Sequence, residues 1–215
     1  MNERIEKVPL IAIARHRLST DGEGVTTLVA FHGCPLRCEF CLNPQSICTE
    51  EEGVWKYYDP RQLYDEVKKD ELYFLATGGG ITFGGGEPYL RSHFISAFRA
   101  LCGPQWSLTL ETSLNVPREW VEKLLSVVNS YIVDIKDMNE LIYHNYTGQS
   151  NARVIDNLRY LAQQGKAEQI TVRIPLITSY NTEEDREESI SRLKEMGFSH
   201  FDLFTYRTPI NTPQP

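Results

Sequence analysis

The stretch FHGCPLRCEFCLNP, residues 31–44, places three of the five cysteines of the chain within eight residues, at the spacing Cys-x3-Cys-x2-Cys. It follows the apolar, β-branched run 25–31, which predicts a buried strand. Three thiolates on one tight loop at a strand end repel one another unless a cation holds them together. Sulfur ligands at this density indicate zinc or an iron–sulfur cluster.

The number of clustered thiols bears on which of these two sites is present. A structural zinc site is closed by four protein ligands, and an electron-transfer cluster normally uses four cysteines. A fourth ligand is not obvious, since Cys48 lies seven residues on, Cys102 is distant in sequence and His32 sits at the strand end. A cubane on three cysteines leaves one iron open, which is a catalytic arrangement. The loop favours this open cluster, and a zinc knuckle that uses His32 or Cys48 is the alternative.

Composition excludes several other classes of protein. The 215 residues predict one domain, spanning 1–215, with 41% hydrophobic and 24% charged residues, as in ordinary globular proteins. A net charge of −7 argues against a nucleic-acid partner. No apolar run approaches the ~20 residues of a membrane span, and segment 1–7 has no signal-peptide core. With cysteines that do not form a disulfide pattern, these features predict a cytoplasmic protein without membrane contact.

Strands and helices alternate along the chain. Apolar or alternating runs predict strands at 25–31, 81–83, 106–111, 131–136, 169–177 and 200–205, with a further short strand at 8–14. Helical spacing and capping residues predict helices that begin at 59 and span 90–101, 117–128, 151–164 and 182–196. Repeated strand–helix units imply an α/β fold with a parallel sheet. Because eight units close a barrel, six predict an incomplete, laterally open (β/α)6 barrel, followed by an extended tail at 207–215.

Polar and charged residues recur where the six main strands end. The cysteine loop follows the first strand, Gly84-Gly85-Gly86-Glu87 the second and Glu111-Thr112-Ser113 the third, while Asp134 and Lys136 end the fourth and Arg173 lies in the fifth. Active sites of such barrels lie at the carboxyl ends of the strands. Glycines there let backbone carbonyls approach a ligand, and with Glu87 they would suit an ammonium group. A glycine-rich turn without a ligand is the alternative.

Two of these motifs together resemble a known family. Cys-x3-Cys-x-aromatic-Cys, with Phe40 as the aromatic residue, is followed at the next strand end by Gly-Gly-Glu-Pro, and this pair resembles the core of the radical S-adenosylmethionine (SAM) superfamily. Further matching stretches are similar to glycyl-radical-enzyme activating enzymes, namely 19–24, 78–88, 110–112, 134–136 and the helix start near Asn151. The resemblance spans about 19–206, nearly the whole chain.

The resemblance implies a set of site residues. Cys34, Cys38 and Cys41 would hold one [4Fe–4S] cluster, since no cysteine-rich insert lies between Asn43 and Asp59. The positions implied to contact SAM are Phe40, Gly85, Gly86, Glu87, Glu111, Thr112, Asp134, Lys136 and Arg173. A monovalent cation is implied beside Glu111, Thr112 and Asp134, and Asp21 and Arg173 are implied to face the substrate.

The implied activity is reductive cleavage of SAM to methionine and a 5′-deoxyadenosyl radical, which takes a hydrogen atom from a backbone glycine of a partner glycyl-radical enzyme. The implied partners are that enzyme and an electron donor such as a flavodoxin or ferredoxin. Two alternatives remain. One is a radical SAM enzyme that acts on a small molecule or a precursor peptide, and the other is a non-catalytic zinc or iron–sulfur scaffold.

Overall fold

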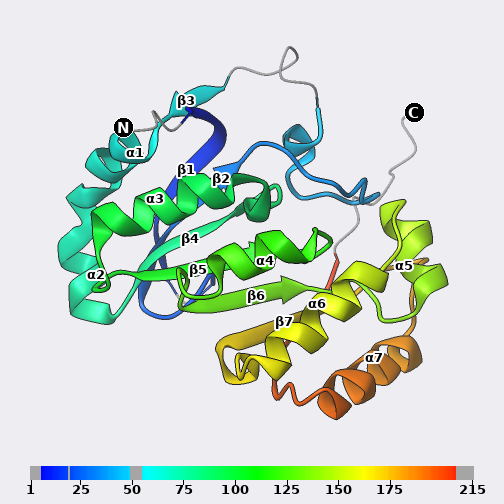
Figure 1. Ribbon diagram of the computed structural model, residues 1–215. Helices are drawn as coiled ribbons and strands as arrows, with labels where there is room; N and C mark the ends of the chain where they lie inside the picture. Colours follow the sequence, from blue (N-terminus) through cyan, green and yellow to red (C-terminus); the bar gives the residue numbers. More distant parts are fainter. Residues whose placement is uncertain (1–5, 19, 49–54, 207–215) are drawn as a thin grey trace.

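An eight-stranded sheet organises the molecule, in the strand order β3-β1-β2-β4-β5-β6-β7-β8 (Figure 1). The strands are β1 (Val8–Leu18), β2 (Val25–Phe31), β3 (Lys56–Tyr58), β4 (Gly80–Gly85), β5 (Ser107–Thr112), β6 (Ser130–Asp134), β7 (Ile170–Leu176) and β8 (His200–Thr205). The computed structural model describes residues 6–18, 20–48 and 55–206, so the tail expected at 207–215 lies outside the described residues.

Six neighbouring strands, β2 and β4 to β8, run parallel to one another. This confirms the predicted α/β fold with an open sheet, because β3 and β8 end the strand order and do not pair with each other. The two remaining strands, β1 and β3, pair antiparallel at one edge. The sequence predicted β1 only over 8–14 and missed β3, which at three residues is too short to show a periodic pattern.

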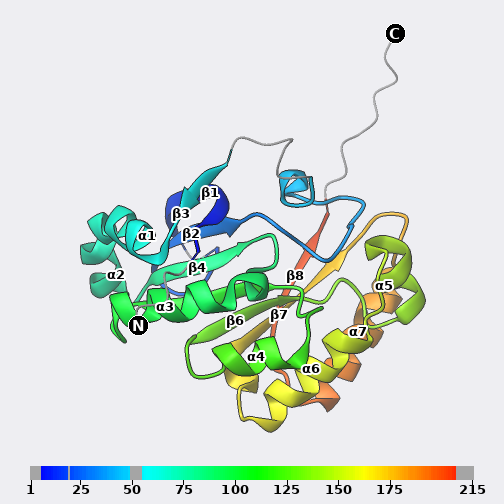
Figure 2. The ribbon, with the colours of Figure 1, turned by 45° about the horizontal axis from the view of Figure 1, so that its top comes forward.

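Helices cover the outer face of the curved sheet (Figures 1 and 2). They are α1 (Pro60–Val67), α2 (Glu71–Thr77), α3 (Ser92–Cys102), α4 (Arg118–Leu124), α5 (Glu140–Thr147), α6 (Ala152–Gln163) and α7 (Glu183–Glu195), with short 3-10 turns η1 (Pro44–Ser46), η3 (Lys68–Asp70), η4 (Pro88–Arg91) and η5 (Ala167–Gln169). Within the described residues, no helix has both the length and the apolar composition that crossing a membrane requires.

Capping residues explain where two predicted helices begin. Asp59 accepts a hydrogen bond from Gln62 N and starts α1, and Thr182 does the same for α7 through Asp185 N. The structure adds α5, which the sequence did not predict because its eight residues carry little apolar periodicity. Asn139 caps α5 by accepting from Leu141 N at 2.9 Å.

The core between the sheet and α1 to α3 is aromatic. Phe31 and Phe83, on the neighbouring strands β2 and β4, stack with ring centroids 5.6 Å apart. Phe94 and Phe98 of α3 meet these rings edge-on. All four side chains are buried, and truncating such a side chain to alanine costs about 3–5 kcal/mol. This packing fixes β2 and β4 relative to each other, and their carboxyl ends carry the cysteine loop and the glycine segment.

Candidate active site

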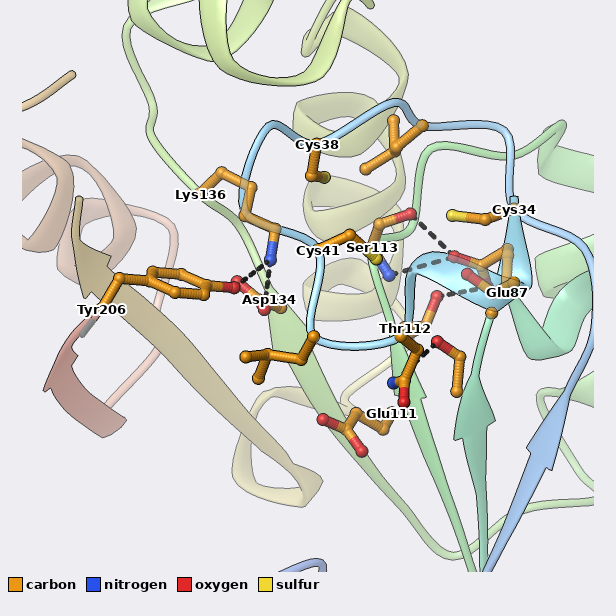
Figure 3. A pocket seen from close by; sticks show the side chains of 16 residues that line it. Cys34, Cys38, Cys41, Glu87, Glu111, Thr112, Ser113, Asp134, Lys136 and Tyr206 are labelled. Atoms are coloured by element: carbon orange, nitrogen blue, oxygen red, sulfur yellow. Dashed lines mark hydrogen bonds and ion pairs between the residues drawn. The ribbon is translucent and has the colours of Figure 1, made fainter. Parts of the chain in front are cut away.

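A pocket lies at the carboxyl ends of the parallel strands (Figure 3). Its lining residues are Cys34, Leu36, Cys38, Cys41, Leu42, Asn43, Ser46, Gly85, Gly86, Glu87, Glu111, Thr112, Ser113, Asp134, Lys136 and Tyr206. The structure therefore brings together the three cysteines and seven of the other positions implied by the sequence. Three implied positions, Phe40, Arg173 and Asp21, do not line this pocket.

The cysteine loop is anchored at both ends by backbone hydrogen bonds. Near β2, Gly86 N donates to Phe31 O at 2.9 Å and Glu87 N donates to Gly33 O at 2.8 Å. Further on, Arg37 N donates to Thr147 O at 2.9 Å and Glu39 N donates to Tyr146 O at 3.2 Å, so the last carbonyls of α5 hold the loop. Figure 1 shows the loop, in blue, running from β2 toward α5.

The glycines of the second motif allow two backbone segments to approach each other. A Cβ added to Gly86 would lie 2.1 Å from Gly33 O, and one added to Gly85 would lie 2.5 Å from the Ala30 side chain. Gly85 also has a φ of 86°, which side-chain-bearing residues rarely adopt. These glycines are therefore required for the cysteine loop and the end of β4 to lie side by side.

Two of the three thiols, those of Cys34 and Cys38, lie in surroundings that disfavour the free thiolate. Burial, together with the charge of Glu87, raises the pKa of Cys34 to about 12. Burial also raises the pKa of Cys38 to about 11. Without added positive charge both groups stay protonated at neutral pH, and iron or another cation would supply that charge.

The remaining candidate metal ligands are engaged elsewhere. Cys48 Sγ donates to Gln45 O at 3.0 Å, and His32 Nε2 lies 2.9 Å from Cys48 O. Neither residue lines the pocket. Across the described ranges, no three His, Cys, Asp or Glu side chains converge closely enough to hold a single ion. The thiols that line the pocket are those of Cys34, Cys38 and Cys41, and three thiolates fit an iron–sulfur cluster with one open position better than a zinc knuckle closed by four ligands.

Glu87 is used inside the protein. Its buried carboxylate accepts hydrogen bonds from Thr112 Oγ1 at 2.6 Å, from Ser113 N at 3.0 Å and Ser113 Oγ at 2.7 Å, and from Tyr89 N at 3.3 Å. Burial raises the pKa of Glu87, and these hydrogen bonds oppose the rise. Figure 3 shows the carboxylate directed toward Thr112 and Ser113. Glu87 thus joins the glycine segment to the end of β5.

A buried cation lies on the opposite side of the pocket. Lys136 Nζ donates to Asp134 Oδ2 at 2.5 Å and to Tyr206 Oη at 3.2 Å (Figure 3). Burial by itself lowers the pKa of Lys136, but the Asp134 carboxylate, Tyr206 and Cys38 together outweigh it and hold that pKa well above its ordinary value. The other oxygen, Asp134 Oδ1, is buried and has no hydrogen-bond partner among the described residues. Such an acceptor suits a positively charged ligand group.

Tyr206 was not among the implied site residues. It follows β8 directly and belongs to an aromatic cluster with Tyr146, its ring centroid 6.2 Å away, and Phe204 at 5.2 Å. Phe40 packs on the same cluster, 6.3 Å from Tyr146, and does not line the pocket. The available sequence signal was the position of Tyr206 at the end of the last strand.

Arg173 and Asp21 take part in ion pairs below the pocket. Arg173 donates to Glu111 Oε1 at 2.7 Å and to Asp202 Oδ2 at 2.9 Å. Burial raises the pKa of Glu111, and Arg173 opposes the rise. Asp21 is buried and pairs with Arg17. Arg173 lines a second, polar cavity toward the amino ends of β5 to β8, separate from the cysteine pocket.

Comparisons with known proteins agree with this geometry. Residues 28–193 match the model of the Radical SAM superfamily. The chain is 33% identical over 202 residues to the pyruvate formate-lyase-activating enzyme of Listeria monocytogenes, which covers 88% of this chain and 78% of that protein. It is 29% identical over 238 residues to the (2S)-3-sulfopropanediol dehydratase activating enzyme of Klebsiella oxytoca, with 82% and 74% covered.

Solved structures show the same fold at low sequence identity. Streptococcus suis SuiB bound to S-adenosylmethionine has a TM-score of 0.64 at 16% identity, and the match covers 86% of this chain and 43% of SuiB. QueE from Escherichia coli has a TM-score of 0.52 at 14% identity, with 93% and 95% covered. With the family match and the sequence relatives, the open sheet and the three-cysteine pocket lead to one conclusion: the chain belongs to the radical SAM superfamily and, within it, to the glycyl-radical-enzyme activating enzymes.

Proposed function

We propose that this enzyme cleaves SAM reductively and uses the resulting 5′-deoxyadenosyl radical to take a hydrogen atom from a backbone glycine of a partner enzyme. The observation that carries the proposal is the arrangement of one pocket. Three cysteines of a single loop lie there opposite a buried lysine and a carboxylate oxygen that has no partner among the described residues. Radical SAM proteins as a family use a [4Fe–4S] cluster and SAM. When bound, these groups supply the electron and the radical.

Cys34, Cys38 and Cys41 are the residues that would hold the cluster. Their loop is fixed by β4 on one side and by α5 on the other, so the three thiols are positioned before any metal binds. The pocket provides no fourth cysteine, because Cys48 and Cys102 do not line it. This supports a cluster with one position left for SAM.

The amino-acid end of SAM finds complementary charges in the same pocket. Lys136 stays protonated at neutral pH because its pKa is raised, and its ammonium group would attract the SAM carboxylate. Asp134 Oδ1, which has no hydrogen-bond partner among the described residues, would accept from the SAM amino group. Glu87, by contrast, would act by holding Thr112 and Ser113 in place, since its oxygens are already engaged.

A monovalent cation beside Glu111, Thr112 and Asp134 stays a prediction. Glu111 is paired with Arg173, and Thr112 Oγ1 donates to Glu87. Asp134 Oδ1 and Glu111 Oε2 are the carboxylate oxygens of this set that have no hydrogen-bond partner within the described structure. These two oxygens are the ones that would face such a cation.

The proposed substrate is a glycine-containing loop of a protein. The names of the relatives describe activators of other enzymes, including pyruvate formate-lyase and (2S)-3-sulfopropanediol dehydratase. A sheet whose edge strands β3 and β8 do not pair leaves a lateral opening for such a loop. Asp21 and Arg173, whose charged groups lie deeper in the barrel, are the residues proposed to face it. A flavodoxin or ferredoxin is the proposed electron donor.

The test is anaerobic incubation of the reconstituted enzyme with SAM, a reductant and candidate partner enzymes. We expect 5′-deoxyadenosine in proportion to a glycine-centred radical on the partner, measured by chromatography and by electron paramagnetic resonance. A Cys38→Ser variant is the matched control and should yield neither. Formation of 5′-deoxyadenosine with no radical on any candidate partner would argue for a different substrate. Absence of 5′-deoxyadenosine under every reducing condition would contradict the proposal as a whole.

A further inference from the structure

Lys136 has an unusual backbone conformation. Its φ is +64°, and Asp137 N donates to Ile135 O at 2.8 Å across it, so Lys136 is the central residue of a γ-turn with positive φ. This form of the γ-turn is rare and strained for a residue with a side chain. The turn comes directly after β6, and with it the Lys136 ammonium group reaches Asp134 and Tyr206.

A buried carboxylate outside the pocket holds the residues that follow the turn. Asp137 is only 1% exposed, and its carboxylate accepts hydrogen bonds from Asn139 N at 2.8 Å and from Asn181 Nδ2 at 3.0 Å. Ser189 Oγ donates to it at 3.4 Å and also accepts from Met138 N at 3.0 Å. Asp137 does not line the pocket. Its partners come from the loop after β7 and from α7.

The partners of Asp137 are themselves fixed. Asn181 accepts from Ile177 N at 2.6 Å and donates to Pro175 O at 3.1 Å, which ties it to the end of β7. Asn151, just before α6, donates to Met138 O at 3.0 Å. The segment after Lys136 is therefore held by buried polar groups from the loop after β7, from α7 and from the residue before α6, and Asp137 and Met138 do not line the pocket. A buried hydrogen-bond network of this kind fixes backbone geometry.

We propose that Asp137 is a positioning residue, whose carboxylate, held by Asn181 and Ser189, keeps the γ-turn closed so that the Lys136 ammonium group points into the cofactor pocket. The inference rests on the proposed function only for the identity of the ligand that Lys136 binds. The way in which Lys136 is held does not depend on that function. Without the carboxylate, Asn139 N and Asn181 Nδ2 lose an acceptor, and the turn can relax to ordinary backbone angles. Lys136 then loses its fixed place beside Asp134.

The first test needs no cofactor. The purified full chain is treated with an acylating reagent, and modification of Lys136 is followed by mass spectrometry. We expect slow modification in the wild type, because Lys136 is buried and paired, and modification about tenfold faster in Asp137→Ala. Asp70→Ala is the matched control, since Asp70 is equally buried, accepts three side-chain hydrogen bonds and lies outside the pocket. Equal rates at Lys136 in all three proteins would overturn the inference.

The second test uses a double-mutant cycle on the reconstituted enzyme. Asp137→Ala and Lys136→Met should each weaken SAM binding about tenfold or more, and the double variant should bind no more weakly than Lys136→Met alone. If the two losses of SAM affinity multiply in the double variant, Asp137 acts independently of Lys136, and this result contradicts a positioning role. If Asp137→Ala does not fold, Ser189→Ala and Asn181→Ala each remove one donor and should show the same faster labelling.

The two tests separate the inference from the proposed function. Faster labelling of Lys136 in Asp137→Ala, together with a wild type that binds no SAM, would support the positioning role of Asp137 and contradict the proposed cofactor. Normal SAM binding and unchanged labelling in the folded Asp137→Ala variant would contradict the positioning role of Asp137. The proposed cofactor would not be affected by that result.

Discussion

Glu87 illustrates how a single side chain can serve a binding site without facing the ligand. From the sequence, a carboxylate after three glycines suggested a partner for an ammonium group. In the structure, the carboxylate instead accepts from Thr112 and Ser113 at the end of the neighbouring strand. Among the described residues, Asp134 is the pocket carboxylate that has a buried oxygen, Oδ1, without a hydrogen-bond partner. Residue type and strand position indicated both residues, but only the three-dimensional hydrogen-bond pattern separates their roles.

Replacing Glu87 with glutamine tests its structural role. The amide would place a donor against the Ser113 donors or against Thr112, leaving at least one buried group unsatisfied. We expect Glu87→Gln to lose about 1–3 kcal/mol of unfolding free energy, measured by urea denaturation. Glu66→Gln, a change at a partly exposed surface carboxylate, is the control and should stay within about 0.5 kcal/mol of the wild type. Equal stability of the two variants would contradict this account of Glu87.

Single residues also mark the limit of sequence reasoning. The three cysteines, the two glycines and the pair Asp134 and Lys136 could be predicted because thiols, glycines and charges at strand ends have few structural uses. Tyr206 could not be distinguished from the many aromatic residues of the core. Phe40 was expected beside SAM, whereas its ring packs against Tyr146 and Tyr180. Side-chain direction depends on packing that no local pattern encodes.

At the level of elements, α5 connects the two halves of the pocket. Its first residue comes four positions after Lys136, and its last carbonyls accept from the backbone of the cysteine loop. Its eight residues gave no clear period, so the sequence did not predict it. The six parallel strands were predictable because each is apolar and bounded by turn residues or a helix cap. The short strand β3 and the irregular register of β1 were not.

Removing the α5 cap tests this connection. Asn139 accepts from Leu141 N at 2.9 Å and Ile142 N at 3.4 Å, and Asn139→Ala should cost about 1 kcal/mol. Because α5 holds the cysteine loop, we expect faster hydrogen exchange at the amides of Arg37 and Glu39, measured by NMR or mass spectrometry.

The matched control for that variant is Asp59→Ala, which removes the cap of α1 at a comparable cost. Helix α1 packs against α3 and β3, whereas the cysteine loop is held by α5 and by the residues that follow β4. Protection of Arg37 and Glu39 should therefore be unchanged. An equal loss of protection in both variants would show that α5 has no special link to the loop.

At the junction of β1 with η3 and α2, Asp70 makes contacts from which we predict that the stability of the protein depends on pH. Asp70 accepts from Arg15 Nε at 2.6 Å and lies 2.9 Å from His16 Nε2. Burial acts to raise the pKa of Asp70, but these hydrogen bonds and charges outweigh it and hold the pKa below its ordinary value. Folding thus favours the ionised form. The stabilisation is present above the unfolded-state pKa of about 3.9 and is lost as the pH falls through the lower, folded-state value.

The measurement compares urea unfolding of the wild type and Asp70→Asn at several pH values. We expect the wild type to be more stable at pH 7 and the difference to shrink as the pH is lowered below about 4. Asp65→Asn, at an exposed carboxylate that pairs loosely with Arg61, should show little difference at any pH. A difference for Asp70 that stays constant with pH would contradict the assignment.

The whole molecule is built on a sheet that does not close into a barrel, because its end strands β3 and β8 do not pair with each other. Composition and strand–helix repetition were enough to predict a laterally open parallel sheet, because helical crossovers between parallel strands allow few arrangements. They could not predict that β1 and β3 extend one edge with antiparallel pairing. Such edge strands depend on contacts between distant segments rather than on their own short patterns.

For the whole molecule, we propose that the three cysteines would hold a cluster to which SAM adds as a further ligand. The most direct test of this proposal is electron paramagnetic resonance of the anaerobically reconstituted, reduced enzyme, before and after addition of SAM labelled at its amino nitrogen and carboxylate oxygen. If SAM binds in this way, the cluster signal should change and show magnetic coupling to both labels. This coupling should be lost in Lys136→Met. A reduced cluster with an unchanged signal and no coupling at saturating SAM would contradict the proposal.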